Sequence, residues 1–192
     1  LNEVKTIEDK FGKYLPNTEN FQDLDQDACP ISGETENELQ ISKRLFASQK
    51  DINFEPYVGY FKDIYAGHVC INQFREKGTS GGMTKWFLCK LMQKNIVDGV
   101  IHVVRKKSQK TLFDYAISET IDEVREASES AYYTTNFSEV ISKILREKND
   151  KRYVFVGVPC YCKSLNLLRR NSMNFPIISS LIILPIISDS TS

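Results

Sequence analysis

A glycine-rich loop that opens a helix is the feature of this sequence that most constrains its fold. We call residues 73–82 the glycine loop, because three glycines and two hydroxyl residues fall within its last five positions. Met83, Trp86, Phe87 and Leu91 then recur at helical spacing, which predicts a helix beginning near Met83. Such a junction presents backbone N–H groups without helical partners at the positive end of the helix dipole.

The junction has two interpretations. In the first, the N–H groups and the dipole bind a phosphate, and the small residues let it approach the main chain. In the second, Ser80 or Thr79 caps the first helical turn and the glycines only permit the bend. The loop by itself does not decide between an anion site and a capped helix.

Composition excludes several classes of protein. A chain of 192 residues can bury a substantial core, and its 41% hydrophobic and 26% charged residues are ordinary for a globular protein. Lys+Arg and Asp+Glu balance at 25 each, so we expect no nucleic-acid partner. The most apolar run, residues 175–187, contains two prolines and is shorter than the roughly 20 apolar residues of a membrane span. It is better interpreted as a buried strand.

The cysteines indicate a reducing compartment. No charged segment followed by an apolar run opens the sequence, so we expect a cytoplasmic protein whose five cysteines are reduced thiols or metal ligands. Cys29-Pro30 resembles the end of the cluster run C-x2-C-x2-C-x3-C-P. The other three cysteine positions of that run hold Glu19, Gln22 and Asp25. The spacing therefore does not support a complete cluster site here.

The order of apolar segments predicts the fold class. Residues 1–28 are polar and show no period, and a helix over 34–46 and strands within 57–69 follow. Downstream we expect strands at 100–104, 112–117, 153–158 and 175–187, with helices at 120–127, 137–145 and from 165. This order predicts an α/β protein, with α+β as the alternative, built on a mixed, largely parallel sheet flanked by helices.

Two further segments are candidates for a site. Residues 128–136 are rich in hydroxyls and carry Tyr132 and Tyr133, so they could hydrogen-bond ribose or ribityl groups and stack on a planar ring, or simply pack on the surface. Cys160 follows a strand, where residues line the ligand crevice of an open α/β sheet. It could equally be a small apolar thiol under a helix. Its spacing to Cys162 disfavours a thioredoxin-like dithiol.

With these landmarks in order, the sequence resembles the coenzyme F420 hydrogenase/dehydrogenase beta-subunit family. The resemblance covers residues 29–170. Its landmarks are Cys29-Pro30, Ala66-Gly67, Arg75 with Gly78-Thr79-Ser80-Gly81-Gly82, Val97-Asp98-Gly99-Val100, Ser130-Ala131-Tyr132-Tyr133 and Val156-Gly157-Val158-Pro159-Cys160.

The resemblance implies a flavin-dependent oxidoreductase. Such a subunit passes electrons between an iron–sulfur cluster or protein donor, a bound FAD and a second carrier or substrate, of the F420 type or another. Its partners would be an electron-transfer protein or partner subunit and a small-molecule carrier. Bacterial relatives also suggest a link to polysaccharide biosynthesis. The resemblance further implies a remnant of a ferredoxin-like region over residues 1–50 and a flavin-binding α/β domain over 51–192.

The same resemblance assigns site residues. The FAD diphosphate would be held by Arg75, Gly78, Thr79, Ser80, Gly81 and Gly82, and Ser130 and Tyr133 would line the flavin site. Cys160 and Cys29 would be ligands of a 4Fe–4S cluster. No catalytic acid or base is nominated, because the flavin itself carries the electrons. We also expect valine at Gly81 to block the diphosphate and abolish FAD binding while leaving much of the fold intact.

The sequence also departs from the family. Cysteines expected before Cys29 and beyond the end of this chain are missing, which leaves Cys160 with too few partners for a four-cysteine cluster. We therefore expect a truncated or degenerate bacterial-type member. Two alternatives stay open: a non-redox nucleotide or nucleotide-sugar binding protein, and a non-catalytic partner subunit.

Overall fold

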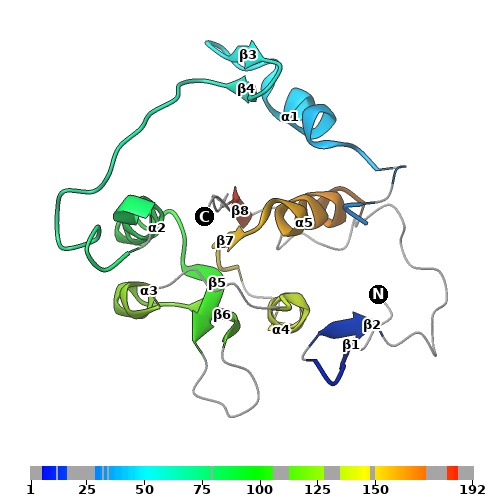
Figure 1. The fold of residues 1–192 in the computed structure, drawn as a ribbon, viewed down its shortest axis with the longest axis vertical. Helices are drawn as coiled ribbons and strands as arrows, with labels where there is room; N and C mark the ends of the chain where they lie inside the picture. Colours follow the sequence, from blue (N-terminus) through cyan, green and yellow to red (C-terminus); the bar gives the residue numbers. More distant parts are fainter. Residues whose placement is uncertain are drawn as a thin grey trace.

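A four-stranded mixed sheet forms the centre of the molecule (Figure 1). The computed structural model describes residues 6–11, 13–16, 29–31, 33, 35–78, 80–105, 113–127, 135–147, 150–171 and 181–185. The strands are β5 (Gly99–Arg105), β6 (Phe113–Ser118), β7 (Tyr153–Gly157) and β8 (Leu181–Pro185), in the order β6-β5-β7-β8. β5 and β6 form an antiparallel hairpin, whereas β7 is parallel to both β5 and β8. The predicted α/β class with a mixed, largely parallel sheet is confirmed.

Helices cover both faces of the sheet (Figure 1). On one face, α2 (Met83–Gln93) and α3 (Ile121–Glu126) pack on the apolar cluster around Val100, Val154 and Val156. On the other, α4 (Ser138–Glu147) and α5 (Pro159–Asn171) pack on the cluster around Ile101 and Phe155. Neighbouring residues of β5 and β7 face opposite helical layers, because side chains alternate along a strand. All five residues of β7 are buried, as expected of a strand covered on both faces.

Capping boxes fix the start of two helices. Thr120 Oγ1 accepts from the backbone N–H of Glu123 at 3.2 Å, and Glu123 Oε2 accepts from the N–H of Thr120 at 3.1 Å, as predicted for α3. In α1 (Glu38–Phe46), Asn37 and Gln40 form the same reciprocal pair. This second box places the start of α1 four residues later than the sequence prediction.

Two short hairpins differ from the sequence predictions. β1 (Thr6–Glu8) and β2 (Tyr14–Pro16) are paired where we expected irregular chain, and Asp9 Oδ1 closes their turn by accepting from the N–H groups of Phe11 and Lys13. β3 (Asn53–Glu55) pairs with β4 (Gly59–Phe61) and contacts α1 through β4. The prediction of strands over 57–69 is therefore right only for β4, because residues 63–70 form no regular element.

The apolar run near the C-terminal end of the sequence forms a strand. β8 lies within residues 175–187, as expected. Among the residues that the structure describes, no helix has both the length and the apolar composition needed to cross a membrane.

Candidate functional site

The glycine loop and Cys160 lie at the same edge of the sheet, on opposite faces. Only five residues connect α2 to β5, so α2 runs back over the sheet and its N-terminus lies near the end at which β5 finishes. α5 begins two residues after β7 and starts from that same edge. In an open α/β sheet, ligands bind in the crevice outside the carboxyl ends of the strands. The topology therefore brings the two predicted sites to the position expected for a ligand.

A glycine occupies the N-cap position of α2. A 3-10 turn over Ser80–Gly82 leads into the helix, and the N-cap residue is Gly82, with a left-handed φ of 71° and no side-chain hydrogen bond to the first turn. The hydroxyl-capped interpretation is thus wrong for the N-cap position. Helical N–H groups at this end have no helical acceptor, which is the property that an anion site requires.

The glycines of the loop are required by the packing of the protein itself. A Cβ at Gly82 would lie 2.1 Å from the carbonyl oxygen of Phe74, and one at Gly78 would lie 2.6 Å from the same atom. At Gly81, where φ is 75°, a Cβ would lie 3.1 Å from the Cβ of His68. Valine at Gly81 would therefore strain the loop itself, so loss of FAD binding in that variant would not by itself identify a diphosphate site. The glycines alone are also no evidence for a phosphate.

Two successive left-handed residues lie where the glycine loop begins. Asn72 and Gln73 both have left-handed backbones, with φ of 54° and 56°, immediately before the buried side chain of Phe74. Non-glycine residues rarely adopt this conformation, and it persists only where the surroundings fix it. Here the backbone N–H of Val69 donates to the carbonyl of Gly81 at 3.0 Å, which holds the loop against the preceding segment.

Lys85 connects the glycine loop to the end of α3. Its Nζ donates to the carbonyl of Lys77 at 3.2 Å and to the carbonyl of Arg125 at 3.3 Å. The Arg125 guanidinium also lies over the ring of Phe74, 5.5 Å from the centroid. The segment that carries Ser130 and Tyr133 leaves the end of α3 only a few residues after Arg125. The two segments expected to share a flavin therefore start from one connected region.

The structure describes some of the predicted site residues and not others. Gly78, Gly81 and Gly82 lie together in the loop, and Arg75 is exposed within it. Thr79, Ser130 and Tyr133 lie outside the described residues, as does the side chain of Ser80. Their roles in the site stay predictions.

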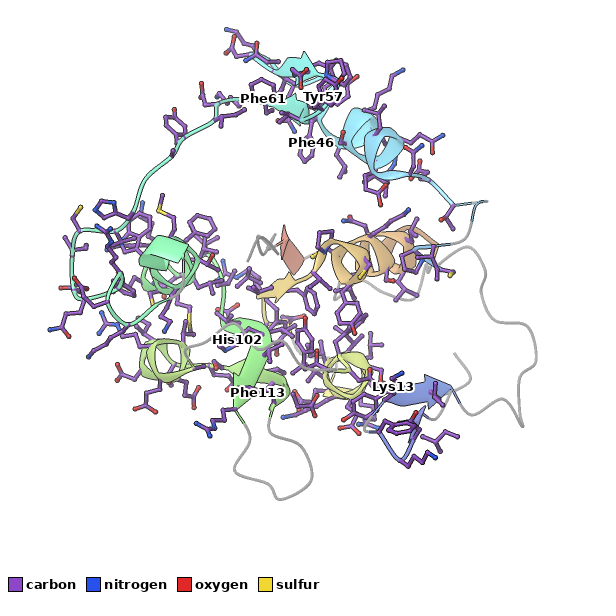
Figure 2. All side chains as sticks on the ribbon, viewed as in Figure 1. Lys13, Phe46, Tyr57, Phe61, His102 and Phe113 are labelled. Atoms are coloured by element: carbon purple, nitrogen blue, oxygen red, sulfur yellow. The ribbon has the colours of Figure 1, made fainter. Side chains whose placement is uncertain are left out.

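Sequence reasoning missed two polar side chains on the α2 and α3 face. Trp86 Nε1 is buried and has no hydrogen-bond partner among the residues that the structure describes. Side chains in a helix lean toward its N-terminus, here toward the glycine loop. His102 on β5 is buried, and its Nε2 lies 2.8 Å from Ser118 Oγ (Figure 2). Burial, followed by the nearby Lys85 charge, lowers the pKa of His102 to about 4. Only the buried apolar run around His102 could have indicated that it faces the core.

Cys160 lies in a helix and not in a loop after a strand. α5 begins at Pro159, six residues before the predicted start, so exposed Cys160 occupies its first turn. Cys162 is buried, its Sγ lies 3.4 Å from the carbonyl oxygen of Gly157, and burial raises the pKa of its thiol to about 11. Cys29 is half-buried. Within the described ranges, no group of three or more His, Cys, Asp or Glu residues could hold a metal ion.

The fold is that of an α/β protein whose glycine loop and first turn of α5 both lie at the carboxyl edge of the sheet. Residues 64–142 match the family described as coenzyme F420 hydrogenase/dehydrogenase, beta subunit, N-terminal. This match agrees with the family resemblance that the sequence indicates, and residues 64–142 carry it. The matched segment contains the glycine loop, α2, β5, β6 and α3, and it ends within α4.

A solved structure is similar in fold. It is a chain of the F420-reducing [NiFe] hydrogenase complex from Methanosarcina barkeri, in a xenon-derivatised form, with a TM-score of 0.56 and 14% identity. The alignment covers 69% of this chain and 46% of that one, so the present chain spans about half the length of its neighbour. At this identity the likeness shows the fold alone. A search of curated proteins gives no significant match.

Proposed function

We propose that this chain is part of a flavin-dependent redox subunit that holds FAD at the carboxyl edge of the sheet. The N-terminus of α2, which has Gly82 at its N-cap and is connected through Lys85 to the end of α3, carries the proposal. The family match over residues 64–142 supports it, because it contains both segments.

The residues at this junction fit a dinucleotide. The first turn of α2 and the exposed Arg75 would hold the diphosphate, as helix N-termini and guanidinium groups commonly do. The buried Trp86 Nε1, which lacks a protein acceptor, adds a donor near the same end of the helix. Ser130 and Tyr133 would line the remainder of the flavin. Bound FAD would supply hydride or electron transfer, and the protein would orient it and tune its potential.

We propose two kinds of electron-transfer partner. A protein donor or partner subunit would reduce or oxidise the flavin, and a small molecule, of the F420 type or linked to polysaccharide biosynthesis, would be the second carrier. Because no described group of side chains suits a metal, we assign no electron-transfer step to Cys160 or Cys29. A cluster held by them stays a prediction from the family resemblance.

A second candidate is a non-redox nucleotide or nucleotide-sugar site. It is favoured by the fact that the described part of the junction suits a diphosphate and contains no identified contact for a flavin ring. FAD, ADP and nucleotide sugars share that diphosphate, so the ring distinguishes the two candidates.

The test measures flavin content and ligand preference. The protein is purified under anaerobic conditions, its visible spectrum is recorded, and any flavin released by denaturation is identified by chromatography. Thermal unfolding is then followed with added FAD, FMN, ADP and a nucleotide sugar, because a ligand of the folded state raises the midpoint. We expect FAD to give the largest increase. Folded, colourless protein that responds equally to ADP and FAD would contradict the flavin proposal.

A further inference from the structure

We propose that the start of α5 and the hydroxyl of Tyr115 bind the carboxylate of a small molecule, on the sheet face opposite the glycine loop. We call Tyr115 Oη, together with the backbone N–H of Cys160, the α5 edge site. This site goes beyond the proposed FAD site and does not require a bound flavin.

The side chain of Tyr115 reaches from β6 to the end of β7. Tyr115 pairs with Val103 of β5, so one strand lies between Tyr115 and β7. Its ring stacks on that of Phe155, with the centroids 5.2 Å apart and the planes 8° from parallel. Its hydroxyl oxygen lies 2.8 Å from the position that a Cβ would take at Gly157. Glycine at this position therefore leaves room for the hydroxyl at the carboxyl edge of the sheet.

The Tyr115 hydroxyl retains a hydrogen-bond donor. Tyr115 is 5% exposed, and its hydroxyl has no hydrogen-bond partner among the residues that the structure describes. Buried tyrosine hydroxyls usually find a partner. The neighbouring Tyr161, whose ring centroid is 6.1 Å away, donates its own hydroxyl to the carbonyl of Thr135 at 2.8 Å. Because a tyrosine is protonated at neutral pH, Tyr115 can donate to a ligand.

The first turn of α5 supplies a second donor. Pro159 has no backbone N–H, and the N–H groups of Tyr161 and Cys162 both donate to the carbonyl of Val158, at 3.0 and 3.1 Å. Within the described ranges, the N–H of Cys160 has no acceptor. The 13-residue helix carries no acidic side chain in its first turn, so the positive end of its dipole is not neutralised there.

The two donors lie at one place on the surface. β7 leads directly into α5, and two residues separate Gly157 from Cys160 (Figure 1). Val158 is 47% exposed and Cys160 is exposed, so a ligand can approach from solvent. Both donors are neutral groups, and a helix N-terminus contributes only about half a positive charge. This suits a singly charged carboxylate better than a doubly charged phosphate.

The experiment uses the exposed thiol of Cys160 as a reporter. The chain without added flavin is alkylated with iodoacetamide at fixed pH and ionic strength, with acetate replacing chloride in steps, and mass spectrometry of peptides gives the rate at each cysteine. We expect acetate to slow alkylation of Cys160 saturably, because a bound anion covers the thiol and disfavours its thiolate. Cys70 is also exposed and should react at an unchanged rate, which controls for the reagent.

Tyr115→Phe tests the hydroxyl while it keeps the stacked ring. We expect it to raise the Kd for acetate by about tenfold, because a hydrogen bond to a charged ligand is lost. Tyr161→Phe is the matched control, because it removes the hydroxyl of a neighbouring ring that already donates to Thr135. It should leave the Kd for acetate unchanged.

Three outcomes would overturn the α5 edge site. The first is alkylation of Cys160 that acetate does not slow, and the second is an equal Kd for acetate in Tyr115→Phe and the wild-type chain. The third is protection by inorganic phosphate and not by acetate, which would contradict the choice of a carboxylate. All three are measured without flavin, so they are independent of whether the chain binds FAD.

Discussion

At the scale of single residues, Gly82 is the position where the loop tolerates least change. Alanine there would place a Cβ 2.1 Å from the carbonyl oxygen of Phe74, at a φ of 71° that alanine adopts only with strain. We expect Gly82→Ala to lower the free energy of unfolding by at least about 2 kcal/mol. Urea denaturation measures this change.

Gly67→Ala is the control for this substitution. A Cβ at Gly67 would meet no atom within 4 Å and no left-handed φ is required there. Its unfolding free energy should stay within about 0.5 kcal/mol of the wild-type value. Equal stability of the two variants would mean that the Phe74 carbonyl does not approach Gly82 as closely as the structure indicates.

His102 makes stability depend on pH. Its folded pKa of about 4 lies below the ordinary value of 6.5, so the unfolded chain binds the proton more readily between these values. The stabilisation is complete above about pH 6.5 and is lost as pH falls toward 4, by up to about 3 kcal/mol. The nearby Lys85 charge acts in the same direction, and the charge of Glu123 acts against it.

Denaturation at a series of pH values tests this dependence. His102→Gln has no titrating ring and should flatten the stability profile between pH 4 and 6.5. His68→Gln replaces the other, exposed histidine and should leave the profile as in the wild-type chain. An unchanged slope in His102→Gln would assign the pH dependence to the carboxylates.

At the scale of elements, one ion pair fixes the starts of two parallel strands. Asp98, just before β5, accepts from the backbone N–H of Arg152 at 2.8 Å and from its guanidinium at 3.0 and 3.1 Å. The backbone N–H of Asp98 in turn donates to the carbonyl of Arg152 at 2.7 Å. These bonds set the register in which Gly99 pairs with Tyr153.

We expect Asp98→Ala to lower the unfolding free energy by about 1–2 kcal/mol, because the backbone N–H of Arg152 loses its carboxylate acceptor. The ion pair itself contributes little to this loss, because both of its side chains are half-exposed. Glu119→Gln, which breaks the exposed pair with Lys151, should change it by less than about 0.5 kcal/mol. Chemical denaturation compares the two. An equal, small effect would show that the backbone pairing alone sets the register.

The elements that could be predicted are those with a local sequence signal. Buried apolar runs indicated β5 and β7, and the spacing of Thr120 and Glu123 indicated the start of α3. β1 and β2 are too short to show a period. The start of α5 was missed because proline at its first position, a common helix start, was treated as the end of a strand.

In the candidate site, too, only the features with a local sequence signal could be predicted. The loop-to-helix junction was visible in the sequence because glycines and helical spacing are local signals. The contacts of Lys85 were not visible, because its acceptors are backbone carbonyls eight and forty positions away, and every residue has such a carbonyl. The sequence also did not show why residue 82 must be glycine, because Gly82 lies close to the backbone of Phe74 and not to a ligand.

At the scale of the whole molecule, the sheet and its four helices are separated from α1 and the β3–β4 hairpin by a connection at residues 62–68 (Figure 1). Every residue of this connection is exposed. Phe46, Tyr57 and Phe61 lie where α1 meets the hairpin, away from the sheet (Figure 2). The family match begins at residue 64, within the connection. We therefore expect the chain to divide at this connection.

Limited proteolysis tests where the chain divides. Tyr65 is 82% exposed, so we expect brief chymotrypsin digestion to cut after it and to release a stable fragment beginning at Ala66. Mass spectrometry identifies the fragment, and Tyr65→Ser should prevent this cut while leaving the unfolding free energy unchanged. Resistance of Tyr65, with cleavage instead near the boundary predicted at residues 50 and 51, would place the division before the β3–β4 hairpin. The fragment beginning at Ala66 should retain FAD binding, because it contains the glycine loop, α2 and α3.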